Sequence, residues 1–491
     1  MTQTTSNNKL PPIENREELI EALKKTAELE HNFMCMYLYA AFSLKKTTPN
    51  SSGNEGELEV ARQWASQVYM VARQEMEHLS LVNSLLAAIG APPNYSRQNF
   101  PIISPFHHSH SLKQRYGLTE EEELEPCDFP FIFEPFDIQS ARRYTCMEGA
   151  KLYNLSLKKQ EHIKEWCFKN SEGECPCLGD SGGISNSKGV DFGDIAKYYK
   201  RLREAFNYLV AKYSSENQSL FVKPDDRHQV EIQNEYSVYL FPVTDLDSAI
   251  NAMELITKQG EGLDAPPDFD THFLTFYNLA KEYQKCEEDV SNFDPLLPIP
   301  RNLIASQDNI PHNPLTRKVF DLFNYSYVTL LYVLTGLYGW YQPPADQPNY
   351  PHLNTALREI AFGPMMTMLI RSLGEVLVRL PWDMDPNQPA APSFYISDED
   401  NQNLQIDSCD NWQSNSQYSF YTDITFYLER FDRILKDINF VVEEVEGLSE
   451  NWVEEELKTR LRFISQNVYR LTGNLRQIYQ TGFFSKFEGV V

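Results

Sequence analysis

The sequence is poor in basic residues, and this scarcity limits the partners that the chain can bind. It holds 44 lysine and arginine residues against 69 aspartate and glutamate residues, which gives a formal charge of −25 in 491 residues. Surfaces that bind phosphate groups need patches of positive charge. We therefore expect no nucleic-acid partner and no anionic membrane surface as a partner.

Cysteine is also scarce, since eight residues in a chain of this length do not make a disulfide scaffold. The opening residues, MTQTTSNNKLPP, lack the apolar core of a secretory signal. A cytoplasmic, reducing location is the default expectation. Residues 1–12 are polar and are expected to be disordered.

The apolar stretch Tyr325–Tyr341 tests whether the chain contains a membrane span. It runs for 17 residues without a charge, whereas a spanning helix needs about 20. It also holds five tyrosines, one serine and two threonines. We expect a buried core helix here and no membrane span.

The remaining pattern is helical, which predicts an all-α fold. Helical spacing of apolar residues is found in ten segments: 17–45, 57–90, 139–168, 192–213, 245–260, 270–288, 315–340, 353–379, 418–445 and 449–481. Only EIQNEYSVYLFPV alternates enough to form a short strand. The proline-rich stretch 291–314 is expected to connect an N-terminal bundle, residues 13–290, to a C-terminal helical domain, residues 315–491.

Two of these helices place titratable residues among apolar ones. Steps of three and four residues along the second helix connect Trp64, Val68, Val71, Glu75, His78, Val82, Leu85 and Ile89. The same steps along the first helix connect Leu23, Ala27, Glu30, Met34, Tyr37, Ala41 and Leu44. A carboxylate on such a face is costly to bury without a partner.

Two inward carboxylates with Glu-x-x-His are half of a dinuclear metal site in a four-helix bundle. Hard cations favour oxygen ligands, and imidazole suits iron, manganese or zinc. The alternative is a hydrogen-bonded pair of Glu75 and His78, with Glu30 held by an arginine or a tyrosine. Glu28 and Glu77 lie on the opposite sides of these helices and are expected to be solvated.

The stretches AELEHNFMCMYLYAAFSLK and ARQEMEHLSLVNSLLAAIGAPP resemble the ferritin-like superfamily. More narrowly, they resemble the ferritin-like domain of iminophenyl-pyruvate dimer synthases, which are enzymes of bisindole pigment pathways, and uncharacterised bacterial relatives. DLDSAINAMELITKQGEG and DTHFLTFYNLAKEY add to the resemblance, which covers roughly residues 15–285. It implies a ferritin-like four-helix bundle with irregular insertions.

The resemblance also implies a second half of the metal site. Glu261 and His272 would be ligands, although a surface turn and a buried core histidine are the respective alternatives. Asp194 stands where relatives carry an acidic residue on the third helix, but it is shorter than glutamate and can instead cap the helix. Glu204 is the other acidic choice on that helix, on its wet face.

A site of this kind predicts a non-haem enzyme with two Fe per chain, or Mn, that uses O2 or peroxide to oxidise a small organic metabolite in specialised metabolism. Tyr37 is the candidate catalytic residue, and its alternative role is to satisfy a buried acceptor. A metal-free binding or scaffold protein and a peroxide-removing protein are the competing hypotheses. The sequence leaves a homo-oligomer open.

The Met-rich segment AFGPMMTMLIRSLGEVLVRLP falls outside this site. Core packing is the default expectation for it, because methionine fills irregular apolar space. The alternative is that it lines a substrate pocket.

Overall fold

The structure is a computed structural model that describes most of the chain. The described residues are 12–46, 55–102, 131–149, 156–167, 195–222, 229–233, 239–260, 271–338, 353–406 without 384 and 386, 419–447 and 455–481. The expected disorder of residues 1–12 concerns a segment that lies almost wholly outside this set.

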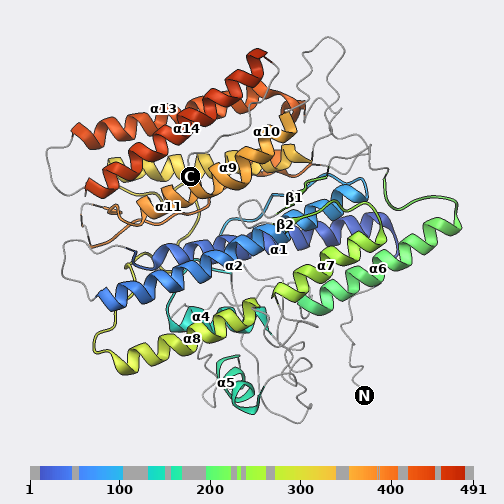
Figure 1. Cartoon of the computed structure of the whole chain (residues 1–491), viewed down its shortest axis with the longest axis horizontal. Coiled ribbons are helices and arrows are strands. Elements are labelled where there is room, and N and C mark those ends of the chain that lie inside the picture. The colour runs from blue at the N-terminus through green and yellow to red at the C-terminus, as the bar shows by residue number, and fades with distance from the viewer. Residues whose placement is uncertain are drawn as a thin grey trace, which may run out of the picture.

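Two long helices form the middle of the molecule: α1, Arg16–Ser43, and α2, Glu55–Ala88. Helix α1 begins where the Asn15 side chain accepts a hydrogen bond from the backbone N–H of Glu18, which satisfies one of the free amides of the first turn. The two helices pack along their lengths and are buried from several sides. Figure 1 shows them in blue between two other groups of helices.

One group packs on the side of α1 and α2 that carries the inward carboxylates (Figure 1). Its elements are α4, Ile138–Glu148; α5, Leu157–Cys167; α6, Ile195–Ser215; α7, Leu246–Gly260; and α8, His272–Asp289. The strands described are β1, Ile232–Gln233, and β2, Tyr239–Leu240, which pair antiparallel with Ile232 opposite Leu240. This small ribbon lies beside α2.

The C-terminal helices form the other group (Figure 1). They are α9, Pro314–Leu337; α10, Leu353–Ile360; the π-helix η4, Ala361–Arg371; α11, Ser372–Leu377; α12, Asp398–Leu404; the 3-10 turn η6, Ser419–Thr422; α13, Ile424–Gly447; and α14, Glu455–Thr481. Helices α13 and α14 form a hairpin over α9 and η4.

These elements confirm the all-α class and correct some of the boundaries. The segment expected as one helix over 139–168 holds two, α4 and α5, joined by a disulfide between Cys146 and Cys167. Helix α12 lies between the expected helices 353–379 and 418–445, where no helix was predicted. Because disulfides are more usual outside reducing compartments, the cytoplasmic location remains a prediction.

The apolar stretch examined for membrane spanning is buried over its described part, as the inner face and end of α9. Among the described residues, Thr355–Leu377 alone is long and apolar enough to qualify as a span by length and composition. Its best window has a mean hydropathy of 1.3, and 72% of that window is buried inside the protein. The buried apolar residues of both halves form one continuous cluster, and the division at 291–314 remains a prediction.

Candidate metal centre

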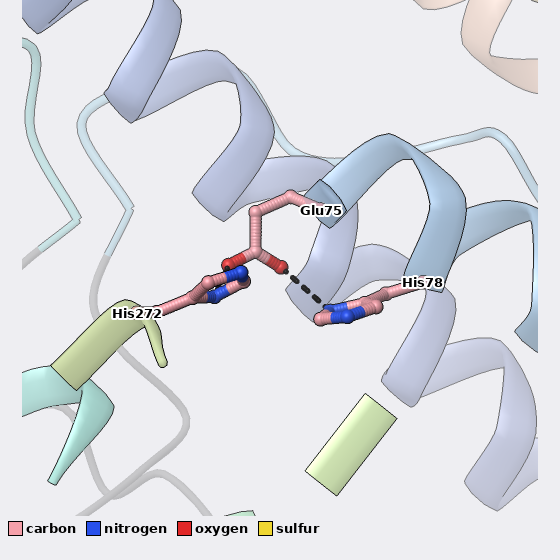
Figure 2. A group of neighbouring side chains, drawn as sticks. All are labelled: Glu75, His78 and His272. Carbon is pink, nitrogen blue, oxygen red and sulfur yellow. Dashed lines mark hydrogen bonds and ion pairs between the residues drawn. The ribbon is translucent and has the colours of Figure 1, made fainter. Parts of the chain in front are cut away.

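The candidate metal centre lies where α1 and α2 face α4 and α8. Glu30 comes from α1, Glu75 and His78 come from α2, and His272 is the first residue of α8. All four side chains are buried, with exposed fractions of 3% or less. Figure 2 shows the carboxylate of Glu75 between the two imidazole rings.

The two oxygens of Glu75 face different histidines. Oε2 lies 3.2 Å from Nδ1 of His78, and Oε1 lies 2.9 Å from Nδ1 of His272. A further carboxylate stands beside each ring: Glu30 Oε2 is 3.5 Å from His78 Nδ1, and Glu148 Oε2 is 3.6 Å from His272 Nδ1. The group therefore divides into two halves, each with one imidazole and one carboxylate of its own, and Glu75 is shared between them.

The far side of each imidazole is held by a glutamine. Nε2 of His78 lies 2.8 Å from the side-chain oxygen of Gln259, and Nε2 of His272 lies 3.1 Å from that of Gln74. An amide oxygen can only accept, so Nε2 is the protonated nitrogen in both rings. In the neutral form of each ring, Nδ1 then presents its lone pair to the carboxylates, which is the tautomer that a metal ligand needs.

Each terminal carboxylate accepts a hydrogen bond from a buried tyrosine. Tyr199 of α6 donates to Glu30 Oε1, and Tyr37 of α1 donates to Glu148 Oε1, both at 2.5 Å. These hydroxyls fix the orientation of two carboxylates that would otherwise rotate. The arrangement repeats in both halves: one imidazole with a glutamine and one carboxylate with a tyrosine.

Burial and close packing of these groups displace their pKa values. Burial raises the pKa of Glu30 to about 7 and also raises the pKa of Glu148. Burial alone would lower the pKa of His272, but Glu75 and Glu148 beside it raise that value to about 9, and the pKa of His78 is raised in the same way by Glu30 and Glu75. The two histidines in turn hold the pKa of Glu75 well below its usual range. In the absence of a metal, protonated imidazoles thus balance the carboxylates.

The donor atoms present fit a metal ion. The ligand atoms of Glu75, His78 and His272 all lie within 4.8 Å of one another. Two ligand atoms that each lie about 2.1 Å from one ion, at a right angle, are about 3 Å apart. The nitrogen–oxygen distances within each half, 2.9 to 3.6 Å, are close to this value. Nδ1 of His272 is buried near two carboxylates, yet it makes no hydrogen bond with any described residue, because the 2.9 Å approach to Glu75 has unsuitable geometry. A cavity of about 20 Å³ lies among these side chains.

The structure brings together Glu30, Glu75, His78, His272 and Tyr37, which the sequence proposed for one site. Their roles as ligands and as catalytic residue remain predictions. Asp194 and Glu261 lie outside the described residues, and Gly260, the residue before Glu261, lines the same small cavity. Glu204 is exposed and lies near Lys200, as expected for the wet face of that helix.

Sequence reasoning missed Glu148, the last residue of α4. It is 3% exposed, and the next residue, Gly149, caps the helix with a positive φ of 38°. A buried carboxylate at a helix C-terminus faces the negative end of the dipole and is unfavourable unless a cation is near. Gly149 is the sequence signal that could have shown that a helix ends at Glu148 and, with the dipole, that a cation is near.

The expectation that Glu77 is solvated is wrong. Its side chain is buried, and its carboxylate accepts hydrogen bonds from the backbone N–H of Tyr239 at 3.1 Å and from Gln259 at 3.4 Å. The helical spacing placed Glu77 correctly away from Glu75, but β2 and α7 cover that side of α2. Because Gln259 also contacts His78, Glu77 orients the glutamine that holds this ring.

Two curated relatives match part of this chain. The chain is 22% identical over 424 residues to a dichlorochromopyrrolate synthase from Lentzea aerocolonigenes, a match that covers 79% of this chain and 37% of that protein. It is 24% identical over 320 residues to a 2-imino-3-(indol-3-yl)propanoate dimerase from Chromobacterium violaceum, covering 60% of this chain and 26% of that protein. The chain thus spans roughly a quarter to two fifths of the length of these curated relatives.

A solved structure of a ferritin-like protein from Caulobacter vibrioides matches with 16% identity and a TM-score of 0.44, over 79% of this chain and 100% of that one. The model of one family, described as ferritin-like, matches residues 23–281, which is more than half of the chain and includes each residue of the candidate metal centre. The chain therefore belongs to the ferritin-like family.

Proposed function

We propose that this protein is a non-haem enzyme that holds two metal ions, iron or alternatively manganese, and uses O2 or peroxide to oxidise a small organic metabolite. The observation that carries the proposal is the position of Glu75, whose two oxygens face two different histidines. Glu30 and His78 would hold one ion, Glu148 and His272 the other, and Glu75 would bridge them. Carboxylate and imidazole ligands are those that iron and manganese accept.

Bound iron or manganese would supply the one-electron steps that O2 or peroxide chemistry requires. The residues of the chain position the ligands and exclude water. Tyr37 and Tyr199 orient Glu148 and Glu30 through their hydroxyls, and Gln74 and Gln259 keep the imidazoles in the ligating tautomer. Tyr37 Oη donates to Glu148 Oε1, and burial together with this carboxylate raises the pKa of Tyr37, so the tyrosine keeps its proton.

The relatives support an organic substrate in specialised metabolism. Their names describe a synthase and a dimerase, the second of an indole-bearing imino acid. Because this chain matches only part of each relative, their names indicate at most the class of substrate, a small organic metabolite. The tight cavity beside the ligands, about 20 Å³, has room for small oxygen species.

The test is metal content followed by reactivity. Protein purified without chelator, or reconstituted anaerobically with Fe(II), is expected to hold two ions per chain and to oxidise them on exposure to O2, with new absorption in the near ultraviolet. Glu75→Gln is expected to lose both ions. Glu28→Gln is the control, because Glu28 is a partly buried glutamate of α1 that lies outside the site and accepts a hydrogen bond from the backbone N–H of Gln98.

A specific observation keeps a metal-free binding protein as the second candidate. The carboxylates and imidazoles already form ion pairs with one another, so the pocket can remain folded without an ion. Elemental analysis that finds no transition metal after reconstitution, in a protein that keeps its native circular dichroism, would select this candidate. Two bound Fe(II) that stay reduced in air would instead remove the oxidase and leave a metal-binding protein.

A further inference from the structure

A second, larger cavity lies on the opposite face of α1 and α2. It has a volume of about 780 Å³ and is walled by α1 and α2 on one side and by α9, η4, α11 and α14 on the other. The elements that surround the candidate metal centre, α4, α6, α7 and α8, contribute nothing to it. Figure 1 shows these groups on opposite sides of the blue helices. The volume is in the range of small-molecule sites, roughly 300–1,000 Å³.

The body of this cavity is long and apolar. Residues of α2 from Arg62 to Leu79 line it, which corresponds to about 26 Å of helix axis. Four methionines, Met34, Met70, Met76 and Met366, lie along its walls. Their flexible side chains adapt to the shape of an apolar guest.

One end of the cavity is positively charged. Lys46, Arg62, Arg371 and Arg460 line it there, against one lining carboxylate, Glu375. Arg62 and Arg371 are exposed, so this end is the mouth. Glu375 is already engaged, since it lies 3.1 Å from Arg371 and 2.6 Å from Arg460.

Lys46 and Arg62 form no ion pair within the described part of the chain, although Glu375 is near enough to Lys46 to act on its pKa. Among the described residues, none of the acidic side chains lies within 4 Å of either cation. The ammonium of Lys46 donates to the backbone oxygens of Ala41 and Leu44, at 2.9 and 3.2 Å, and lies 5.3 Å from the centre of the Tyr69 ring. Arg62 donates through Nε to the backbone oxygen of Lys46, so the two residues are in contact at this end of the cavity. A half-buried cation without an ion-pair partner is unfavourable, and one negatively charged group beside the ammonium of Lys46 would stabilise it.

The wall opposite α2 has an unusual backbone. Helix η4 is a π-helix of 11 residues with Pro364 inside it, and it lines the cavity through Phe362, Met366, Thr367, Ile370 and Arg371. π-Helical turns are rare and are frequently found at functional sites. This is the Met-rich segment of the sequence, and it lines a pocket in addition to packing in the core.

We propose that this cavity binds an amphipathic monocarboxylate, with the carboxylate between Lys46 and Arg62 at the mouth and the apolar body along α2. Arg73 lines the same wall, eleven residues after Arg62, and its buried Nε has no hydrogen-bond partner among the described residues. The site is separate from the candidate metal centre and does not depend on the function proposed for it.

The experiment is isothermal titration of the full-length protein with laurate and, for comparison, with 1-dodecanol. One laurate is expected to bind per protein molecule. The alcohol has the same hydrocarbon chain without the charge and is expected to bind at least tenfold more weakly, because it loses a charge-assisted hydrogen bond. Pyrenebutyrate tests an aromatic body with the same head group. Equal affinity for laurate and the alcohol, or no binding of either carboxylate, would overturn the proposal.

Two pairs of variants locate the site. Lys46→Met is expected to weaken laurate binding at least tenfold, whereas Lys45→Met is not, because Lys45 pairs with Asp294 and does not line the cavity. Met366→Trp fills the cavity and is expected to abolish binding, whereas Met368→Trp, on the same helix but outside the lining, preserves it. Equal effects within either pair would contradict the assignment.

A titration of chelator-treated protein separates this proposal from the metal centre. Laurate affinity is expected to be the same with and without metal, since none of the candidate ligands lines the cavity. Failure to bind metal would therefore leave this proposal standing, and failure to bind laurate would leave the metal centre standing.

Discussion

Removing the metal is expected to make the stability of the protein depend on pH through His272. This side chain is 1% exposed and lies between Glu75 and Glu148, at 2.9 and 3.6 Å. The two carboxylates raise the pKa of His272 from 6.5 to about 9 in spite of its burial. The folded protein therefore holds a proton that the unfolded chain releases.

The sign and size of the effect follow from this difference. Each pH unit between the unfolded and folded pKa corresponds to about 1.4 kcal/mol, so protonated His272 contributes about 3 kcal/mol to the free energy of unfolding. That contribution is complete below pH 6.5 and is lost as the pH rises through about 9. Glu30 acts in the same direction at lower pH, because burial raises its pKa from 4.5 to about 7 and the stability of its protonated form is lost across that interval.

The assay is urea unfolding followed by circular dichroism at 222 nm, from pH 6 to pH 9, on chelator-treated and Mn(II)-loaded protein. Metal-free protein is expected to lose about 3 kcal/mol through His272 between pH 6.5 and 9, and His78, whose pKa is raised in the same way, adds to that loss. Loaded protein is not expected to lose this stability, because the ions replace the protons. His272→Gln is expected to remove about 3 kcal/mol of this dependence and to leave the part that His78 carries. His312→Gln is the control, since His312 also pairs with a carboxylate, Asp383, but its side chain is 77% exposed. A metal-free protein whose stability stays level over this range, or a His272→Gln variant that keeps the slope, would refute the reasoning.

Three further predictions concern other parts of the molecule. Glu148→Ala is expected to reduce the metal content from two ions per chain to one by elemental analysis, and an unchanged content would exclude this residue as a ligand. Laurate affinity is expected to fall roughly tenfold from pH 7 to pH 9 in calorimetry, because Lys46 loses its charge over this range. Burial lowers the pKa of Lys46 to about 8; two nearby arginines lower it further, and Glu375 partly opposes both effects. Lys46→Met is expected to remove this dependence. Gly374→Ala is expected to lower the free energy of unfolding in urea by about 1–3 kcal/mol, because its Cβ would overlap the ring of Phe42. Gly473→Ala, which has open space around it, is expected to be neutral or stabilising. Equal effects would mean that α11 and α1 adjust freely.

The parts that the sequence predicted well are those that repeat along a helix. The apolar spacing of α1 and α2 placed Glu30, Glu75 and His78 on inner faces, and the structure finds them there. A regular helix fixes the direction of each side chain relative to its neighbours a few residues away. That local rule is sufficient for one helix and for the pair that it forms with the next.

The parts that the sequence missed depend on which helices meet across the molecule. Glu148 is the last residue of the short helix α4, which packs against α8. This contact depends on the tertiary structure, so no local spacing in the sequence connects Glu148 to His272. Glu77 shows the converse error. Glu77 lies away from the apolar face of α2 that carries Glu75, which implied that it is exposed to solvent. Because α2 is covered on both sides, however, its second face is buried as well.

Burial of α1 and α2 on both sides gives the molecule two separate internal surfaces, and the last prediction concerns their independence. The candidate metal centre is lined from one side of this pair and the laurate cavity from the other. Perturbations at sites without shared partners add, because neither changes the contacts of the other. Lys46→Met should therefore leave the metal content at its wild-type value, His272→Gln should leave laurate affinity unchanged, and the double variant should show the sum of the single effects to within about 0.5 kcal/mol. Calorimetry and elemental analysis on the four proteins measure both quantities. A larger coupling would show that the α1–α2 pair shifts as a unit when either site is filled, and it would connect the cavity to whatever chemistry the metal centre performs.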